Sequence, residues 1–419
     1  MGKLYVFRIA STATSTEVGQ TKRTIPFVPY LEGLRGIAAL YVVLFHVRIL
    51  LEPNYVPFGP TADALPFRGQ FLLYGHYAVG IFIVISGFVL TLPIAVRGML
   101  VGGWRAFLKR RARRLLPGYY AALTLALPLY VFRTHVEGKT LSLATVAGQY
   151  IAHLLLIHDL NVHTIWGINA PLWSVALEVQ IYVLFVAMLV PVVYRFGLLA
   201  AVTSAFVLGY IPTIVGAALH MTPYPFSSAC FWFLGLFALG SAAAFIAYDR
   251  KDRFAALRNH VPWKVVSIVA FVAFVWLVLP LYEDPHDLSY RVDPILGIGV
   301  AAGFIAVAKD LSAGRRSIVA SVLGWRPFVI LGSFSYSLYL IHDPIILLAM
   351  HYLNHMPAPA RLVLATCLVV SIVVLAYAFA RVFEYPFISS ARRAADKPSI
   401  AVPHAPNATT TSIITEGLR

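Results

Sequence analysis

Three ionisable side chains, His46, Glu178 and His342, interrupt apolar stretches of the sequence. A titratable group inside a hydrocarbon layer costs free energy, so such residues commonly mark functional sites. Neutral imidazole can remove a proton from a hydroxyl group near neutral pH, and a carboxylate can orient the ring and stabilise the resulting imidazolium. The three residues therefore predict a general-base site, the alternative being hydrogen bonds that only join helices.

A second group of chemically capable residues is basic. The segment 97–114 carries seven Lys and Arg residues and no acidic residue. Within it, Arg111 and Arg114 are three residues apart, so on a helix they share a face and form a fork that suits phosphate. This pattern predicts a phosphate-binding surface, and the alternative is a charge signal that sets the orientation of the chain in a membrane.

The chain that must position these residues is strongly apolar. Of its 419 residues, 59% are hydrophobic and only 12% are charged, whereas an average soluble domain carries about 25% charged residues. A soluble chain could not bury so much apolar surface, so the composition excludes a soluble globular enzyme, a disordered chain and a disulfide scaffold. Cys230 and Cys367 both lie in apolar runs, which predicts neither a disulfide bridge nor a metal site.

A helix that crosses a membrane needs about 20 mostly apolar residues. Ten stretches approach this requirement and predict an all-α, polytopic membrane protein. They are Tyr30–Leu50, Phe71–Val96, Leu115–Phe132, Leu172–Tyr194, Leu199–Ala217, Phe226–Tyr248, Val265–Leu281, Pro294–Ala308, Phe328–Met350 and Leu362–Phe383. A further stretch, Leu141–His158, contains Gln149 and His153, and we expect it to lie at the interface or to re-enter rather than to cross.

The distribution of charge predicts the orientation, because basic residues collect on the cytoplasmic side of membrane proteins. With the N-terminus inside and ten crossings, the inside segments carry 25 Lys and Arg residues and the outside segments carry six. The net charge of +15 then reflects topology rather than a nucleic-acid partner. We expect both termini in the cytoplasm, with an arm over 1–29, a membrane domain over 30–387 and a disordered tail over 388–419.

The predicted spans also place the ionisable residues in depth. At 1.5 Å per residue, His46 lies about 24 Å above the inner face, and Glu178 and His342 lie about 21 Å above it. Matched depth on three separate spans predicts a shared internal cavity. Arg35 and the Arg111–Arg114 pair, by contrast, are predicted at the inner face.

Six short motifs occur in a fixed order along the chain. They are Leu31-Glu32-Gly33-Leu34-Arg35-Gly36 with His46 after ten intervening residues; Ser86-Gly87-Phe88; Arg114-Leu115-Leu116-Pro117; Leu172-Trp173-Ser174 with Glu178; Ser335-Tyr336-Ser337-Leu338-Tyr339-Leu340-Ile341-His342; and Glu384-Tyr385-Pro386. In the order and content of these motifs, the sequence resembles the integral-membrane acyltransferase family 3 from about Pro29 to Phe387. It departs from the family pattern at Gly80, where many members have an acidic residue, and at Ile83, where many have an aromatic one.

The resemblance implies O-acyl transfer to sugars and related hydroxyl acceptors. The donor would be a cytoplasmic acyl-CoA, usually acetyl-CoA, acting as co-substrate without a permanently bound cofactor, and the acceptor a glycan or similar envelope molecule at the outer side of a bacterial inner membrane. Arg35, Arg111 and Arg114 would bind the donor, and His46 would act as base with Glu178. Direct attack by the acceptor and a transient acyl-histidine both remain open.

Further candidate site residues are His342, Ser86, Trp173, Ser174 and Tyr336. For the two serines we favour a hydrogen bond back to the helix carbonyl or a small-residue packing contact over a functional role. Trp173 and Tyr182 could line the route of the acceptor, but packing is the favoured role for both. Some members of the family carry an appended extracytoplasmic hydrolase domain; this sequence shows none, so we expect the membrane domain to deliver the acyl group alone. The competing function is a transporter or flippase without covalent chemistry, and a third class is a membrane regulator.

Overall fold

A computed structural model describes residues 28–51, 67–138, 140–219, 229–279, 289–353 and 356–387. Within these residues every regular element is helical, which confirms the all-α class. The predicted arm over 1–29, apart from its last two residues, and the predicted tail over 388–419 lie outside the described residues.

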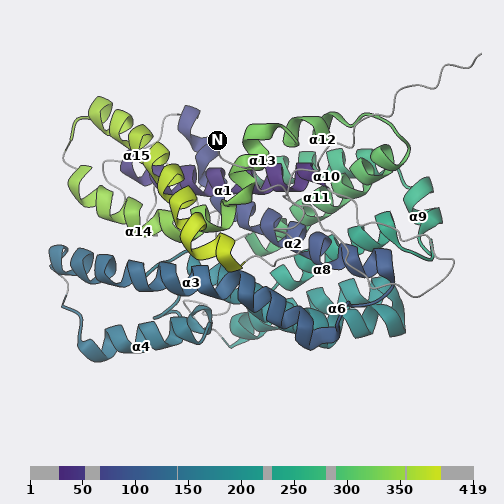
Figure 1. Ribbon diagram of the computed structural model, residues 1–419, viewed down its shortest axis with the longest axis horizontal. Helices are drawn as coiled ribbons and strands as arrows, with labels where there is room; N and C mark the ends of the chain where they lie inside the picture. Colours follow the sequence, from purple (N-terminus) through teal and green to yellow (C-terminus); the bar gives the residue numbers. More distant parts are fainter. Residues whose placement is uncertain are drawn as a thin grey trace, which may run out of the picture.

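The helices follow one another along the chain without strands between them in the described ranges, and Figure 1 shows them gathered into one bundle. The elements are α1 (Pro29–Val47), η1 (Arg48–Leu51), η3 (Phe67–Tyr74), α2 (Gly75–Arg97), α3 (Gly103–Val136), α4 (Leu143–Leu154), η4 (His158–Leu160), α5 (Leu172–Leu184), η5 (Phe185–Leu189), α6 (Val190–Ala218), α8 (Phe233–Tyr248), α9 (Ala255–His260), α10 (Trp263–Val278), α11 (Ser289–Ser312), α12 (Ile318–Leu323), α13 (Arg326–Ser333), α14 (Ser335–Leu353), α15 (Ala358–Phe379), η7 (Ala380–Glu384) and η8 (Tyr385–Phe387).

The predicted number of ten spans is not confirmed, although each predicted range overlaps a helix. Among the described residues, six helices are long and apolar enough to cross a membrane, or seven if the bent pair α13 and α14 counts as one span. The fourth and fifth predicted spans form one stretch, Leu172–Gly216, broken where Gly197 leaves the helical conformation at φ 87°. The helices α8 and α10 have 16 residues each, about 24 Å at 1.5 Å per residue, which is short of a full crossing.

Helix α4 covers most of the predicted non-crossing stretch Leu141–His158. It has 12 residues, about 18 Å, and is therefore too short to span the hydrocarbon core. The Ser142 side chain caps its first turn by accepting a hydrogen bond from the Thr145 backbone N–H at 3.0 Å. Tyr119 and Tyr120 of α3 hold its other end through bonds to the carbonyls of His153 and Leu154.

Helices α2 and α8 cross at two glycines. A Cβ added to Gly87 would lie 2.0 Å from the Phe237 carbonyl oxygen, and one added to Gly240 would lie 2.0 Å from the Val84 carbonyl oxygen. Any side chain at these positions would push the helices apart, which is how small residues permit close packing in membranes. This contact fixes the rotation of α2 and turns Ser86, the neighbour of Gly87, toward α5.

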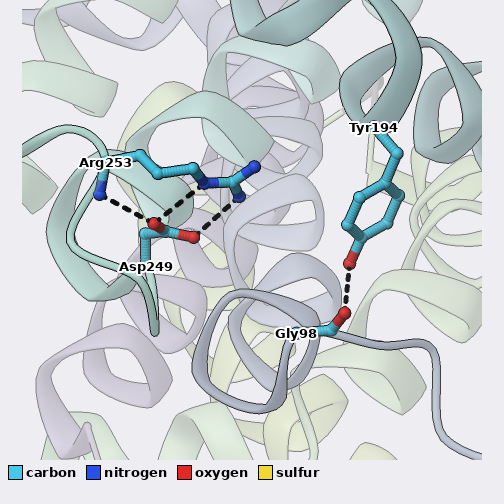
Figure 2. Close-up of polar contacts among 4 residues, drawn as sticks. All are labelled: Gly98, Tyr194, Asp249 and Arg253. Atoms are coloured by element: carbon cyan, nitrogen blue, oxygen red, sulfur yellow. Dashed lines mark hydrogen bonds and ion pairs between the residues drawn. The ribbon is translucent and has the colours of Figure 1, made fainter.

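The turn between α2 and α3 is held by groups from α6 and from the segment after α8 (Figure 2). The Tyr194 hydroxyl donates to the Gly98 carbonyl at 2.8 Å, and the Arg250 backbone N–H donates to the Ala95 carbonyl at 2.8 Å. Arg253 binds both carboxylate oxygens of Asp249, the residue before Arg250. Burial alone would raise the pKa of Asp249, but the hydrogen bonds and charge of Arg253 outweigh it and hold that pKa below its ordinary value. The bonds from Tyr194 and Arg250 fix the turn that precedes α3.

Candidate active site

A cavity of about 80 Å³ brings together predicted site residues from α1, α2, α3, α5 and α14. Of the ten residues predicted from the sequence, seven line it: Arg35, Ser86, Arg111, Arg114, Ser174, Glu178 and Tyr336. Tyr182 and Tyr339 complete its polar wall. Arginines, a carboxylate and hydroxyl groups in one apolar bundle form a site suited to a ligand that carries negative charge and reactive polar atoms.

Glu178 is held in this cavity by two hydroxyl groups. Ser86 of α2 donates to Glu178 Oε1 at 2.9 Å, and Tyr182, one turn further along α5, donates to the same oxygen. The Ser86 and Tyr182 oxygens are 3.1 Å apart, which closes a triangle of polar atoms. Ser86 therefore bonds across to α5, and the favoured expectation of a bond back to its own helix is wrong.

Ser174 behaves differently from Ser86. Its hydroxyl donates back to the Pro171 carbonyl at 3.2 Å, the kind of backbone contact expected as the alternative to a functional role. The same oxygen lies 2.7 Å from the Tyr339 hydroxyl, so Ser174 also fixes one wall of the cavity.

The arginines enter the cavity from two helices. On α3, the Arg111 Nε atom is buried and makes no hydrogen bond to the described residues, and the guanidinium lies 6.0 Å from the centre of the Phe107 ring. On α1, Arg35 Nη1 lies 3.9 Å from Glu32 Oε1 within the same helix. A buried guanidinium nitrogen without a partner is energetically costly, so Arg111 is well suited to an anionic ligand.

The prediction that these arginines lie far from Glu178 is wrong, because all three residues line one cavity. We expected Arg111 and Arg114 in a loop at the inner face, far from the carboxylate. The structure instead begins α3 at Gly103, so Arg111 lies eight residues along the helix, about 12 Å from its start. Arg111 and Glu178 line one cavity and interact electrostatically.

His46 and His342 form a separate cluster. Their ring centres are 4.8 Å apart, with His342 Nε2 3.2 Å from His46 Nδ1. His46 Nδ1 also lies 2.9 Å from the Val42 carbonyl oxygen, and His342 Nδ1 lies 2.7 Å from the Tyr339 carbonyl oxygen. These two residues, which were expected at a similar depth, are in direct contact between α1 and α14.

Glu178 is not the hydrogen-bonding partner of His46 within the described part of the chain, because Ser86 and Tyr182 hold it in the cavity. The carboxylate that acts electrostatically on His46 is Asp343. Sequence reasoning missed Asp343, although it directly follows His342 and the adjacency was a usable signal.

Tyr339 joins the cavity to the histidine cluster. Its hydroxyl faces Ser174 in the cavity wall, while its carbonyl oxygen binds His342. Its ring lies 5.7 Å from the His342 ring, centre to centre. Tyr339 was not singled out from the sequence, although it is one turn before His342.

The two remaining candidates have packing or backbone contacts. Trp173 does not line the cavity; it is 8% exposed and its ring lies 6.1 Å from that of Phe233. Tyr336 lines the cavity, and its hydroxyl donates to the Leu115 carbonyl at 3.0 Å.

The last sequence motif packs beside the site on a π-helical turn. Glu384, in η7, is buried and accepts a hydrogen bond from Ser337 of α14 at 2.7 Å. Single π-helical turns occur often next to functional sites. In the described ranges, no group of three or more His, Cys, Asp or Glu residues is arranged to hold a metal ion.

The fold and the cavity together define a helical membrane protein with a buried, arginine-lined polar site. Residues 28–381 match the family described as "Acyltransferase domain", and the chain belongs to this family. Membership places it among acyltransferases that move groups other than amino-acyl groups. No solved structure matches the chain.

Three similar bacterial proteins carry names that refer to O-acetyl transfer. YrhL of Bacillus subtilis, whose name assigns it provisionally to the peptidoglycan O-acetyltransferases, is 29% identical over 77% of this chain and 49% of its own length. The peptidoglycan O-acetyltransferase OatA of Listeria monocytogenes is 23% identical over 78% of this chain and 51% of its own. The O-acetyltransferase OatA of Staphylococcus aureus is 24% identical, over 78% and 52%. The chain thus spans about half the length of these relatives.

Proposed function

We propose that this protein is a membrane O-acetyltransferase that moves an acetyl group from acetyl-CoA to a hydroxyl group of a peptidoglycan-type glycan. Family membership and the names of the similar proteins support the reaction class and the acceptor. The single observation that carries the proposal is the cavity in which Arg35, Arg111 and Arg114 meet Glu178, with Tyr339 between it and His46–His342.

The arginines bind the donor in this proposal. Arg111 offers a buried guanidinium nitrogen that has no hydrogen-bonding partner among the described residues, and Arg35 and Arg114 line the same cavity. Guanidinium groups bind phosphate oxygens with matched geometry. The phosphates of acetyl-CoA occupy this region, and the extended arm of the donor carries its thioester toward His46.

His46 is the general base. A sugar hydroxyl has a pKa far above 7, so its attack on the thioester carbonyl needs proton removal. His46 takes that proton as the new carbon–oxygen bond forms and the carbon–sulfur bond breaks, and it returns the proton to the thiolate of CoA. A transient acetyl-histidine is the alternative route for the same transfer.

Glu178 acts within the donor part of the site. Its carboxylate interacts with Arg111 and is held by Ser86 and Tyr182. It therefore balances the buried positive charge and orders the cavity wall. Its role in this proposal is electrostatic, and it does not touch the His46 ring.

The two substrates approach from opposite sides. Basic residues are concentrated in 97–114 and 249–264, which supports a cytoplasmic donor and cytoplasmic termini in a bacterial inner membrane. The acceptor then approaches from the outer side.

The test uses the purified full-length chain in vesicles with acetyl-CoA labelled in the acetyl group and soluble peptidoglycan fragments. Mass spectrometry of the fragments should show an added acetyl ester that requires His46. Peptidoglycan fragments that enter the vesicles without becoming acetylated would overturn the proposal and support a transporter or flippase instead.

A further inference from the structure

The hydrogen bonds around His46 and His342 determine which ring nitrogens carry hydrogen. A backbone carbonyl oxygen can only accept a hydrogen bond. His46 Nδ1 lies 2.9 Å from the Val42 oxygen, and His342 Nδ1 lies 2.7 Å from the Tyr339 oxygen. Both Nδ1 atoms therefore carry a hydrogen.

The contact between the rings determines the charge of His342. Its Nε2 lies 3.2 Å from His46 Nδ1, which already carries a hydrogen. A hydrogen on His342 Nε2 would point at that hydrogen, so His342 must be neutral with a lone pair on Nε2. It is also fully buried at 0% exposure, and burial disfavours the charged form of a histidine.

The lone pair of neutral His46 is then on Nε2. Its Nδ1–H is shared between the Val42 oxygen and His342 Nε2. Nε2 makes no hydrogen bond within the described residues, and His46 is partly exposed. This nitrogen is free to receive a proton, while the opposite side of the ring is held by two acceptors.

We propose that His46 reacts through Nε2 and that His342 is the positioning residue that holds it in this tautomer. The inference rests on the proposed function and replaces Glu178 with His342 as the group that orients the base. When Nε2 takes the acceptor's proton, the positive charge spreads to Nδ1–H, and the hydrogen bond to His342 strengthens. The same nitrogen would be the nucleophile on the acetyl-histidine route.

Other charged groups near His46 act in opposite directions. Asp343 of α14 favours the imidazolium, and Arg48 of η1 opposes it. Neither supplies a hydrogen bond to the ring in the described residues. Among the described residues, His342 is thus the one side chain that forms a hydrogen bond with Nδ1 of His46. The alternative is that this contact only joins α1 to α14.

The variants His342→Leu and His342→Gln separate these roles. Leucine fills the space but accepts no hydrogen bond, whereas the glutamine oxygen can replace Nε2 as acceptor. In the acetyl-transfer assay, His342→Leu should lower kcat roughly tenfold to a hundredfold, the effect expected for a hydrogen bond to a charged group. The KM for acetyl-CoA should not change, and the acidic limb of the pH–rate profile should move to lower pH. His342→Gln should recover most of kcat and the original profile.

The control is His351→Leu, which changes an exposed histidine of the same helix and should leave kcat and the pH profile unaltered. A folded His342→Leu variant with normal kcat and profile would overturn the inference. A His342→Gln variant that is as impaired as His342→Leu would also overturn the inference. Equal impairment is the result expected if His342 only packs against His46, because the hydrogen bond that glutamine can accept would then make no difference.

A measurement without substrate covers the case in which His342→Leu does not fold. Nitrogen-15 NMR of the histidine-labelled protein, with His46→Gln to assign the signal, should show Nε2 of His46 unprotonated at neutral pH. An unprotonated Nδ1 would overturn the inference. Failure of the proposed function can be told apart from failure of this inference. The proposed function fails if the wild-type protein transfers no acetyl group or if His46→Ala remains active, and neither result changes the NMR measurement.

Discussion

Ser86 of α2 donates a 2.9 Å hydrogen bond to the Glu178 carboxylate of α5, although the two residues are 92 positions apart in the chain. The bond is possible because Gly87, the next residue, lets α8 approach the backbone of α2 and fixes the rotation of that helix. Tyr182 binds the same carboxylate oxygen. Two hydroxyl groups therefore hold Oε1 of Glu178 inside the arginine-lined cavity.

This arrangement predicts how Glu178→Gln will behave. Because the carboxylate interacts with Arg111 and not with His46, the variant should lose less activity than His46→Ala. The loss should appear mainly in the KM for acetyl-CoA, with the pH–rate profile unchanged. Steady-state kinetics of both variants at several pH values would check this. A larger loss in Glu178→Gln than in His46→Ala would make Glu178 the base.

The arginines of α3 predict weaker donor binding when they are removed. Arg111→Ala and Arg114→Ala should each weaken acetyl-CoA binding by about 1.5–3 kcal/mol, or roughly tenfold to a hundredfold, because a charge-assisted contact is lost. Isothermal titration of the purified variants measures this. Arg105→Ala is the matched control, since Arg105 is exposed on the same helix and outside the cavity. Unchanged affinity in both cavity variants would leave the basic segment as a topology signal.

His46 carries the proton transfer in the proposed reaction. His46→Ala should abolish acetyl transfer yet retain acetyl-CoA binding, because the cavity arginines are unchanged. His46→Gln can still form hydrogen bonds but cannot act as a base near neutral pH, so it should lose about 10²–10⁴-fold in rate. Single-turnover assays give these rates. Near-normal turnover in His46→Gln would reduce His46 to a contact between helices.

The charge asymmetry predicts that 97–114 and 249–264 lie on the cytoplasmic side and that the segment before α4 lies outside. In a background without Cys230 and Cys367, single cysteines at Lys251 and Glu137, both exposed, should react with a membrane-impermeant reagent from opposite sides. Labelling intact cells and inverted vesicles compares them. Labelling of both positions from the same side would contradict the predicted topology.

Asp249 predicts a pH dependence of stability. Arg253 holds the pKa of Asp249 below its ordinary value, so folding favours the ionised carboxylate. This contribution is present above the unfolded pKa of about 4 and is lost as the pH falls through the lower folded pKa. Asp249→Asn should therefore lower the melting temperature at pH 7, with the difference from wild type shrinking toward pH 3.

The expected loss at Asp249 is about 1 kcal/mol or less, because Arg253 is partly exposed to solvent. Thermal unfolding in detergent at both pH values measures it. Asp252→Asn serves as the control, since Asp252 is 57% exposed in its pair with Arg258. Equal effects of the two substitutions at pH 7 would contradict a special role for the Asp249–Arg253 pair.

The sequence by itself determined the class of protein and the position of its helices along the chain. Apolar stretches of about 20 residues are a local property, so each predicted range overlaps a helix. The order of motifs from Arg35 to Glu384 likewise indicated the acyltransferase family, which the match over residues 28–381 confirms.

Only the tertiary structure decided which of these residues meet. Counting depth along each span placed Glu178 beside His46 and left Arg111 at the inner face. That count depends on where each helix begins, and α3 begins at Gly103, earlier than hydropathy suggested. It also ignores the rotation of each helix about its axis. The small-residue contacts of α2 with α8 direct Ser86 toward Glu178 in the arginine-lined cavity. The packing of α1 against α14 places His46 beside His342.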